Sequence, residues 1–129
     1  MNVARKILIV DDDPDIRLIT ELALQLDAGW KVQSAASAQE ACDLLASGWQ
    51  ADMILADVSM PGGSGLDLLR HVRADHAART LPVVLFTASI RQQDLKRFEA
   101  AGAAGVIAKP FDPLTLADEL RRLLAAQGG

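Results

Sequence analysis

The sequence predicts an α/β fold in which five short strands form a parallel sheet with helices on both faces. Short apolar runs alternate along the chain with segments in which apolar residues recur every three or four positions. The apolar runs are bounded by turn residues and show little polar alternation, as expected of strands buried on both faces of a parallel sheet. Alternation of this kind predicts right-handed crossovers, and here a (βα)5 doubly wound arrangement.

Five apolar runs define the expected strands. In chain order they are Lys6–Val10, Trp30–Ala35, Asp52–Ala56, Leu81–Thr87 and Gly105–Ala108. The second run is the weakest, because only Trp30, Val32 and Ala35 in it are apolar. No internal repeat, linker or low-complexity tract interrupts the series, so one domain is expected.

Helical spacing of apolar residues fills the intervals between the strands. The faces expected to pack on the sheet are Ile16, Ile19, Ala23 and Leu26; Ala38, Ala41, Cys42 and Leu45; Leu69 and Val72; Leu95 and Phe98; and Leu116, Leu120 and Leu123. The third helix is expected over Gly65–Asp75, and the last is expected to run to Ala126.

Helix-end signals agree with these segments. Asp13 and Asp112 precede Pro14 and Pro113, which suits a capping side chain followed by the first helical residue. The other signals are a capping box at Ser37–Glu40, an N-cap candidate at Ser64, and helix stops at Gly29, Gly48 and Gly102.

Length, charge and cysteine content exclude several classes of protein. The chain has 129 residues, the size of one domain, and its net charge of −4 provides no basic footprint for direct nucleic-acid binding. A lone cysteine, Cys42, excludes a disulfide or a cysteine metal site within one chain. The N-terminal apolar run is too short for a membrane span and lacks a signal-peptide layout. We therefore expect a soluble cytoplasmic protein without membrane partners, with Cys42 a buried thiol and His71 and His76 on the surface.

Chemically distinctive residues collect where the predicted strands end. The stretch ILIVDDDP places Asp11 and Asp12 directly after the first strand, while Asp57, Thr87 and Lys109 lie at the carboxyl ends of the third, fourth and fifth strands. Ligands bind at the carboxyl edge of an open parallel sheet, so these five residues are expected to form one site.

The residue types at this edge indicate a metal and phosphoryl site. Carboxylates brought together repel one another unless a cation lies between them, and oxygen ligands with open positions suit Mg²⁺. A lysine and a hydroxyl beside a carboxylate neutralise charge that develops in phosphoryl transfer, which makes Asp57 a plausible acceptor. Asp13, directly before Pro14, is better explained as the helix N-cap.

Four motifs resemble those of bacterial response-regulator receiver domains. They are VDD, ADVSMPGGSG, LFTAS and IAKPF, and the resemblance spans the chain from Lys6 to the last helix. It implies a flavodoxin-like sheet of order 2-1-3-4-5, and a single receiver domain over residues 1–129 with no output domain.

The resemblance also implies roles for individual residues. Asp57 would be phosphorylated, with Thr87 turning toward the phosphoryl group and Lys109 forming an ion pair with it. Mg²⁺ or Mn²⁺ would be held by the side chains of Asp12 and Asp57, by the backbone carbonyl of Ser59, and by Asp11 mostly through water. The Lys109–Pro110 bond would be cis.

The implied function is phosphorelay signalling. A histidine kinase or phosphotransfer protein would phosphorylate Asp57, and a surface including Leu95, Val106, Lys109 and Pro110 would change its affinity for a downstream protein. Val106 stands where the family often has tyrosine or phenylalanine. The resemblance implies a monomer or a weak phosphorylation-dependent dimer. It implies no enzyme beyond self-catalysed phosphoryl uptake and autodephosphorylation.

Two alternatives remain open at this stage. One is a Mg²⁺-dependent aspartyl-phosphate phosphatase, although the DxDxT pattern of haloacid-dehalogenase-type enzymes is absent from the DDDPD stretch. The other is a degenerate receiver that binds partners without being phosphorylated.

Overall fold

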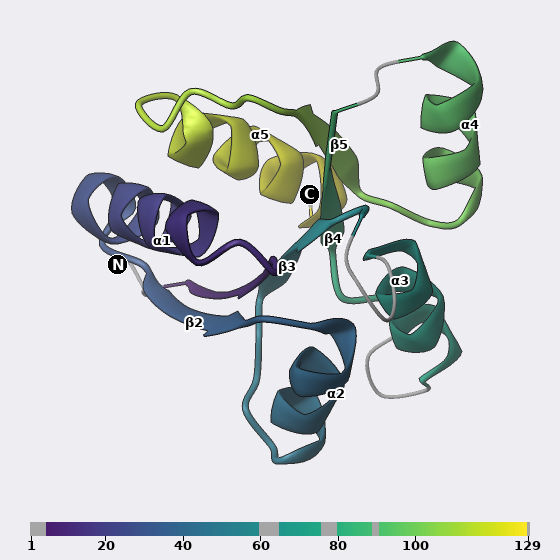
Figure 1. The fold of residues 1–129 in the computed structure, drawn as a ribbon, viewed down its shortest axis with the longest axis horizontal. Helices are drawn as coiled ribbons and strands as arrows, with labels where there is room; N and C mark the ends of the chain where they lie inside the picture. The colour runs from purple at the N-terminus through teal and green to yellow at the C-terminus, as the bar shows by residue number, and fades with distance from the viewer. Residues whose placement is uncertain (1–4, 60–64, 76–79, 89–90, 129) are drawn as a thin grey trace.

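Five parallel strands form one sheet in the order β2-β1-β3-β4-β5 (Figure 1). The structure is a computed structural model that describes residues 5–59, 65–75, 80–88 and 91–128. The strands are β1 Lys6–Val10, β2 Lys31–Ala35, β3 Met53–Asp57, β4 Val83–Thr87 and β5 Gly105–Ala108. The helices are α1 Pro14–Ala28, α2 Ala38–Ala46, α3 Gly65–Ala74, α4 Gln92–Ala100 and α5 Leu116–Gly128. The predicted fold class and strand order are confirmed, with element ends shifted by one or two residues in several places.

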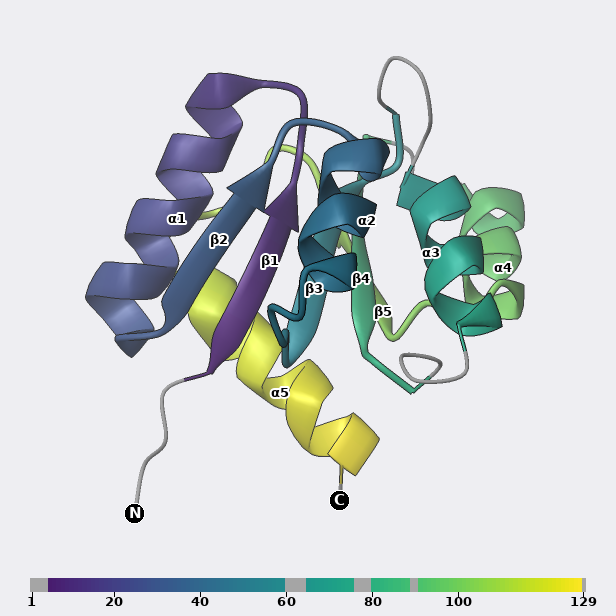
Figure 2. The same ribbon diagram turned by 90° about the horizontal axis from the view of Figure 1, so that it is seen from below.

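The three central strands β1, β3 and β4 are buried on both faces, because their alternate residues pack against different helices. Along β1, Ile7 and Ile9 lie in a core shared with α1 and α5, whereas Leu8 and Val10 lie in a core shared with α2, α3 and α4. Figures 1 and 2 show these two helical layers on opposite sides of the strands. The lack of polar alternation in the sequence follows directly from this double covering.

Backbone hydrogen bonds continue past the ends of the strands at the carboxyl edge. The amide of Asp11 donates to the carbonyl of Ala35 over 3.1 Å, and that of Lys109 donates to the carbonyl of Thr87 over 2.8 Å. The amide of Val58 donates to the carbonyl of Phe86 over 2.9 Å. The segments that leave the sheet at this edge are therefore held in place by the neighbouring strand.

Most predicted helix ends are confirmed. The Asp13 carboxylate accepts from the amide of Asp15 over 2.9 Å, and Gly29 ends α1 with φ of 67°. Ser37 caps α2 by accepting from the amide of Glu40 over 3.1 Å, while the Glu40 carboxylate accepts from the amide of Ala36 over 3.0 Å. The predicted caps of α3 and its preceding loop, Ser64 and 60–63, lie outside the described residues.

The predicted start of the last helix is wrong. α5 begins at Leu116 and not at Pro113. Asp112 instead closes a turn, because its side chain accepts from the amide of Leu114 over 2.9 Å and its carbonyl accepts from the amide of Thr115 over 3.1 Å. An Asp–Pro pair stabilises either a turn or a helix start, so the sequence signal alone does not separate them.

The apolar face predicted for the first helix is also wrong. Ile19 and Leu26 are 42% and 84% exposed, whereas Thr20 and Leu24 are fully buried. Apolar residues surround most of α1, so their spacing does not identify the face that packs. Thr20 tolerates burial because its hydroxyl donates to the carbonyl of Ile16 over 2.7 Å.

The remaining predictions concern single side chains. His71 is exposed as expected, Cys42 is half-buried and not fully buried, and His76 lies outside the described residues. Among the helices in the described part of the chain, none has the length and apolar character needed to cross a membrane.

Candidate functional site

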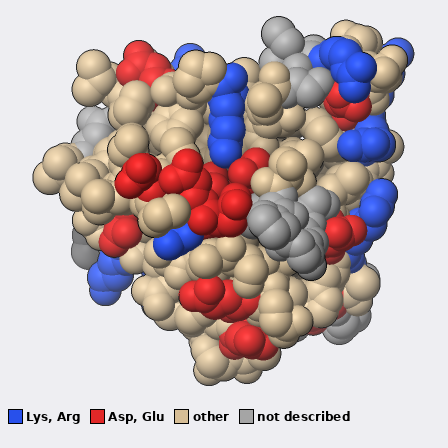
Figure 3. All heavy atoms as spheres, in the orientation of Figure 1, with Lys and Arg blue, Asp and Glu red and all other residues tan. Residues whose placement is uncertain are grey.

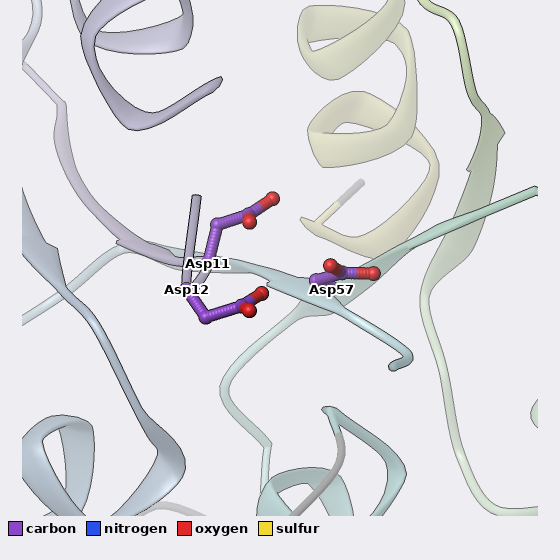
Figure 4. A group of neighbouring side chains, drawn as sticks. All are labelled: Asp11, Asp12 and Asp57. Atoms are coloured by element: carbon purple, nitrogen blue, oxygen red, sulfur yellow. The ribbon is translucent and has the colours of Figure 1, made fainter. Parts of the chain in front are cut away.

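Three aspartates meet at the carboxyl edge of the sheet. Asp11 and Asp12 follow β1, and Asp57 is the last residue of the neighbouring strand β3. One carboxylate oxygen from each residue lies within 4.8 Å of the others. Figure 4 shows the three side chains at the ends of their strands. Asp11 and Asp57 are buried, while Asp12 is exposed. In Figure 3 acidic side chains gather at the centre of the face, with a basic side chain beside them.

Lys109 joins two of these carboxylates. Its Nζ lies 3.1 Å from Oδ2 of Asp11 and 3.1 Å from Oδ2 of Asp57. Burial by itself would lower the pKa of Lys109, but its hydrogen bonds to Asp57 and Asp11 outweigh this and hold the pKa above the ordinary 10.5. The ammonium group is therefore charged at neutral pH and is positioned to meet an anion placed on Asp57.

Asp11 is the most deeply buried of the three aspartates. Burial raises the pKa of Asp11 above the ordinary 3.8, although hydrogen bonds from the Asp13 amide and from Lys109 act in the opposite direction. The Asp13 amide donates to Oδ1 of Asp11 over 2.9 Å. Charging this carboxylate without a metal thus costs free energy in the folded state.

We expect the substitution Asp11→Asn to reveal this cost as a pH-dependent change in the free energy of unfolding. Because the pKa of Asp11 is higher in the folded than in the unfolded chain, its contribution to stability falls as pH rises from about 3.8 through the raised value. The free energy of unfolding of the variant, relative to the natural chain, should therefore increase from pH 3 to pH 7. Urea unfolding in EDTA measures it, with the exposed Asp118→Asn as the control for surface charge. A difference that stays flat or decreases with pH would contradict the assignment.

The donor set suits a divalent cation. Three carboxylates face one ammonium group, so negative charge is in excess, and oxygen-only ligands are those that hard cations prefer. Asp57 is held in place because the amide of Ser59 donates to its Oδ1 over 3.2 Å. The carbonyl of Ser59 belongs to the same short segment, close enough in sequence to contribute a further oxygen.

The first residue of α3 lies against the backbone of Asp57. A Cβ atom on Gly65 would lie 2.9 Å from the carbonyl carbon of Asp57 and 3.2 Å from Cβ of Ala56. Only glycine fits between the helix and the strand at this separation. The structure thus couples the position of α3 to that of Asp57.

The other predicted residues lie on the β4 and β5 side of the site. Thr87 is buried at the end of β4, directly after Phe86, which pairs with Asp57 in the sheet register. The Lys109–Pro110 peptide bond is cis, as the resemblance implies. Leu95 on α4 and Val106 on β5 are half-buried against the core that contains α2, α3 and α4.

One polar residue at the site was missed by the sequence interpretation. Nη1 of Arg17, on α1, donates to the backbone carbonyl of Asp11 over 2.7 Å. A signal was present, since Arg17 interrupts an apolar stretch between Ile16 and Leu18. A side chain that bonds a backbone carbonyl has no sequence pattern of its own, however, so the partner was not predictable.

Comparison with known protein families identifies the family of the chain. Residues 7–121 match the family model of the response regulator receiver domain. The chain belongs to this family.

Several receiver proteins resemble the chain over nearly its whole length. Chemotaxis protein CheY-3 of Vibrio cholerae is 36% identical over 124 residues, which cover 95% of this chain and 94% of the relative. The solved structure of CheY4 of Vibrio cholerae has a TM-score of 0.86 at 34% identity, over 94% of this chain and 99% of that one. The phosphate regulon transcriptional regulatory protein PhoB of Escherichia coli is 33% identical, but the match covers only 52% of its length. The chain thus shares its family with proteins named for chemotaxis and for transcriptional regulation.

Proposed function

We propose that this receiver domain accepts a phosphoryl group on Asp57 from a phosphohistidine protein and so changes its affinity for a downstream partner. The observation that carries the proposal is the position of Lys109, whose Nζ lies 3.1 Å from the carboxylates of both Asp11 and Asp57. An acceptor carboxylate with a fixed cation and two further carboxylates beside it fits Mg²⁺-dependent phosphoryl transfer.

The chemistry is a simple displacement. An oxygen of Asp57 forms a bond to phosphorus while the phosphorus–nitrogen bond of the donor histidine breaks, and the imidazole keeps the electron pair. The side chains of Asp12 and Asp57 and the Ser59 carbonyl would hold Mg²⁺, with Asp11 acting mostly through a bound water, and the ion would supply positive charge to the phosphoryl oxygens. Lys109 pairs with the new anion, and the Thr87 hydroxyl donates a hydrogen bond to it.

The conformational change on phosphorylation would be transmitted from the site to β4 and β5. The amide of Lys109 donates to the carbonyl of Thr87, so the two residues that would bind the phosphoryl group are joined through the backbone. Their rearrangement would bias the surface that includes Leu95, Val106 and Pro110 toward a second conformation. Val106 lacks the aromatic ring that often reports this change in the family, so the side-chain readout would differ.

A protein donor has an apolar surface to bind that begins beside the site, where Ile19 and Lys109 line the same cavity. Large apolar side chains are exposed on α1 and just before α5, namely Leu18, Ile19, Leu22, Leu26 and Leu114. Covering them would contribute hydrophobic free energy that a small donor such as acetyl phosphate does not gain. The proposal places this donor, and the receiver itself, in the cytoplasm.

Intact mass after incubation with acetyl phosphate tests the proposal. We expect the mass of one phosphoryl group to be added in the presence of Mg²⁺, and no addition in EDTA. Because a short-lived adduct escapes this measurement, Mg²⁺-dependent binding of beryllofluoride is measured in parallel. Failure of both would favour a receiver that binds partners without phosphorylation, whereas sustained turnover of phosphate monoesters would favour a phosphatase.

A further inference from the structure

Arg17, on the first turns of α1, contacts the turn that carries two of the acidic residues. It is half-buried on α1, and Nη1 donates to the backbone carbonyl of Asp11 over 2.7 Å. Its own amide donates to the carbonyl of Asp13, the N-cap residue, over 3.0 Å. The side chain therefore reaches back across the β1–α1 turn from a helix whose start is fixed by its cap.

The hydrogen bond completes the set of contacts that hold Asp11. The Asp11 amide donates to Ala35, and its carboxylate accepts from the Asp13 amide and from Lys109. The carbonyl group is the remaining polar group of this buried residue, and Arg17 donates to it. Each polar group of Asp11 thus has a partner from a different part of the chain.

The carbonyl of Asp11 belongs to the peptide unit that joins Asp11 to Asp12. This unit is planar, so fixing the direction of its carbonyl also fixes the direction of the Asp12 amide and restricts where the Asp12 side chain leaves the backbone. Asp12 is exposed and lies at the outer side of the cluster, where little packing constrains it. A charge-assisted hydrogen bond is a strong way to hold the unit.

We propose that Arg17 is a positioning residue for the metal-binding carboxylates, acting through the Asp11–Asp12 peptide unit. This inference rests on the proposed function, because it concerns the same cation site. It assigns Arg17 no contact with the metal or the phosphoryl group. Arg17 raises cation affinity. Without it the Asp11–Asp12 peptide unit would be loosely held, and ordering that unit would cost free energy when the cation binds.

The test is Mn²⁺ binding by the variants Arg17→Ala and Arg17→Lys, measured by electron paramagnetic resonance of the free ion. We expect Arg17→Ala to weaken Mn²⁺ binding about tenfold, the loss typical of one charge-assisted hydrogen bond. Arg17→Lys should recover part of the affinity because it restores a charged donor. The control is Arg70→Ala, which removes the same charge from the exposed surface of α3, where Arg70 is paired with Asp67.

Two further readouts separate positioning from a general structural role. In acetyl phosphate reactions, Arg17→Ala should raise the Mg²⁺ concentration needed for half-maximal uptake but keep the rate at saturating Mg²⁺. In metal-free protein, the ¹⁵N chemical shift of the Asp12 amide should change in Arg17→Ala and not in Arg70→Ala. The reason is that the hydrogen bond from Arg17, which only the first variant removes, polarises the Asp11–Asp12 peptide unit.

Each outcome has a definite meaning. Mn²⁺ affinity of Arg17→Ala within twofold of the natural chain would overturn the inference while leaving the proposed function intact. An unchanged Asp12 amide shift would also overturn it. If the natural chain itself binds no Mn²⁺, the proposed function fails, and the amide shift still decides whether Arg17 positions the peptide unit.

Discussion

Asp57→Asn is expected to abolish the Mg²⁺-dependent gain of mass from acetyl phosphate. The variant has no carboxylate oxygen at position 57 to attack phosphorus, and it removes one of three carboxylates that lie within 4.8 Å of one another. The fold should survive, because an asparagine oxygen still accepts from the amide of Ser59, as Oδ1 of Asp57 does over 3.2 Å. Uptake should fall below detection while the thermal unfolding of the variant stays cooperative.

The matched control is Asp118→Asn, which makes the same chemical change on the surface of α5. Its carboxylate is 63% exposed and pairs with Arg121. This variant should take up the phosphoryl group as the natural chain does, since exposed ion pairs contribute little to stability. If Asp57→Asn gained the same mass as the natural chain, another residue would be the acceptor, and peptide mapping of the adduct would identify it.

Gly65→Ala is expected to reduce both stability and phosphoryl uptake. The added methyl group would lie 2.9 Å from the carbonyl carbon of Asp57 and 3.2 Å from Cβ of Ala56, so α3 or the end of β3 must move. Overpacking of this kind costs about 1–3 kcal/mol. Because the displaced atoms include the backbone of Asp57, the rate of uptake should also fall, which urea unfolding and intact mass measure on the same sample.

Gly48→Ala separates steric clash from backbone strain. Gly48 has φ of +99° and no atom within 4 Å of an added Cβ. The substitution should therefore cost about 1 kcal/mol through its backbone conformation, without changing the rate of phosphoryl uptake. Equal loss of uptake in both glycine variants would show that uptake follows overall stability and that Gly65 has no particular connection to Asp57.

The parts of the structure that were predictable from sequence are those fixed by chain order and strand ends. Asp11, Asp57 and Lys109 converge because each follows or ends a strand of one parallel sheet, and carboxyl ends of parallel strands share an edge. Strand identity was visible because double burial leaves an almost continuous apolar run.

The parts that were not predictable depend on choices between nearly equal local alternatives. The face of α1 was misassigned because apolar residues surround the helix, and burial of Thr20 depends on a hydroxyl bonded within its own helix. The start of α5 was misassigned because Asp112 closes a turn as readily as it caps a helix. The contact of Arg17 with Asp11 depends on the geometry of the turn, which appears only in three dimensions.

The ion pair between Lys109 and Asp11 joins residues that are 98 positions apart. During synthesis on the ribosome the three aspartates emerge long before Lys109, and β5 must add to β4 before the lysine reaches them. Contacts of such sequence separation form late, because long loops must close first. A growing or partly folded polypeptide therefore lacks a complete site. Under the proposed function, we therefore expect phosphoryl uptake only after the last strand is in place.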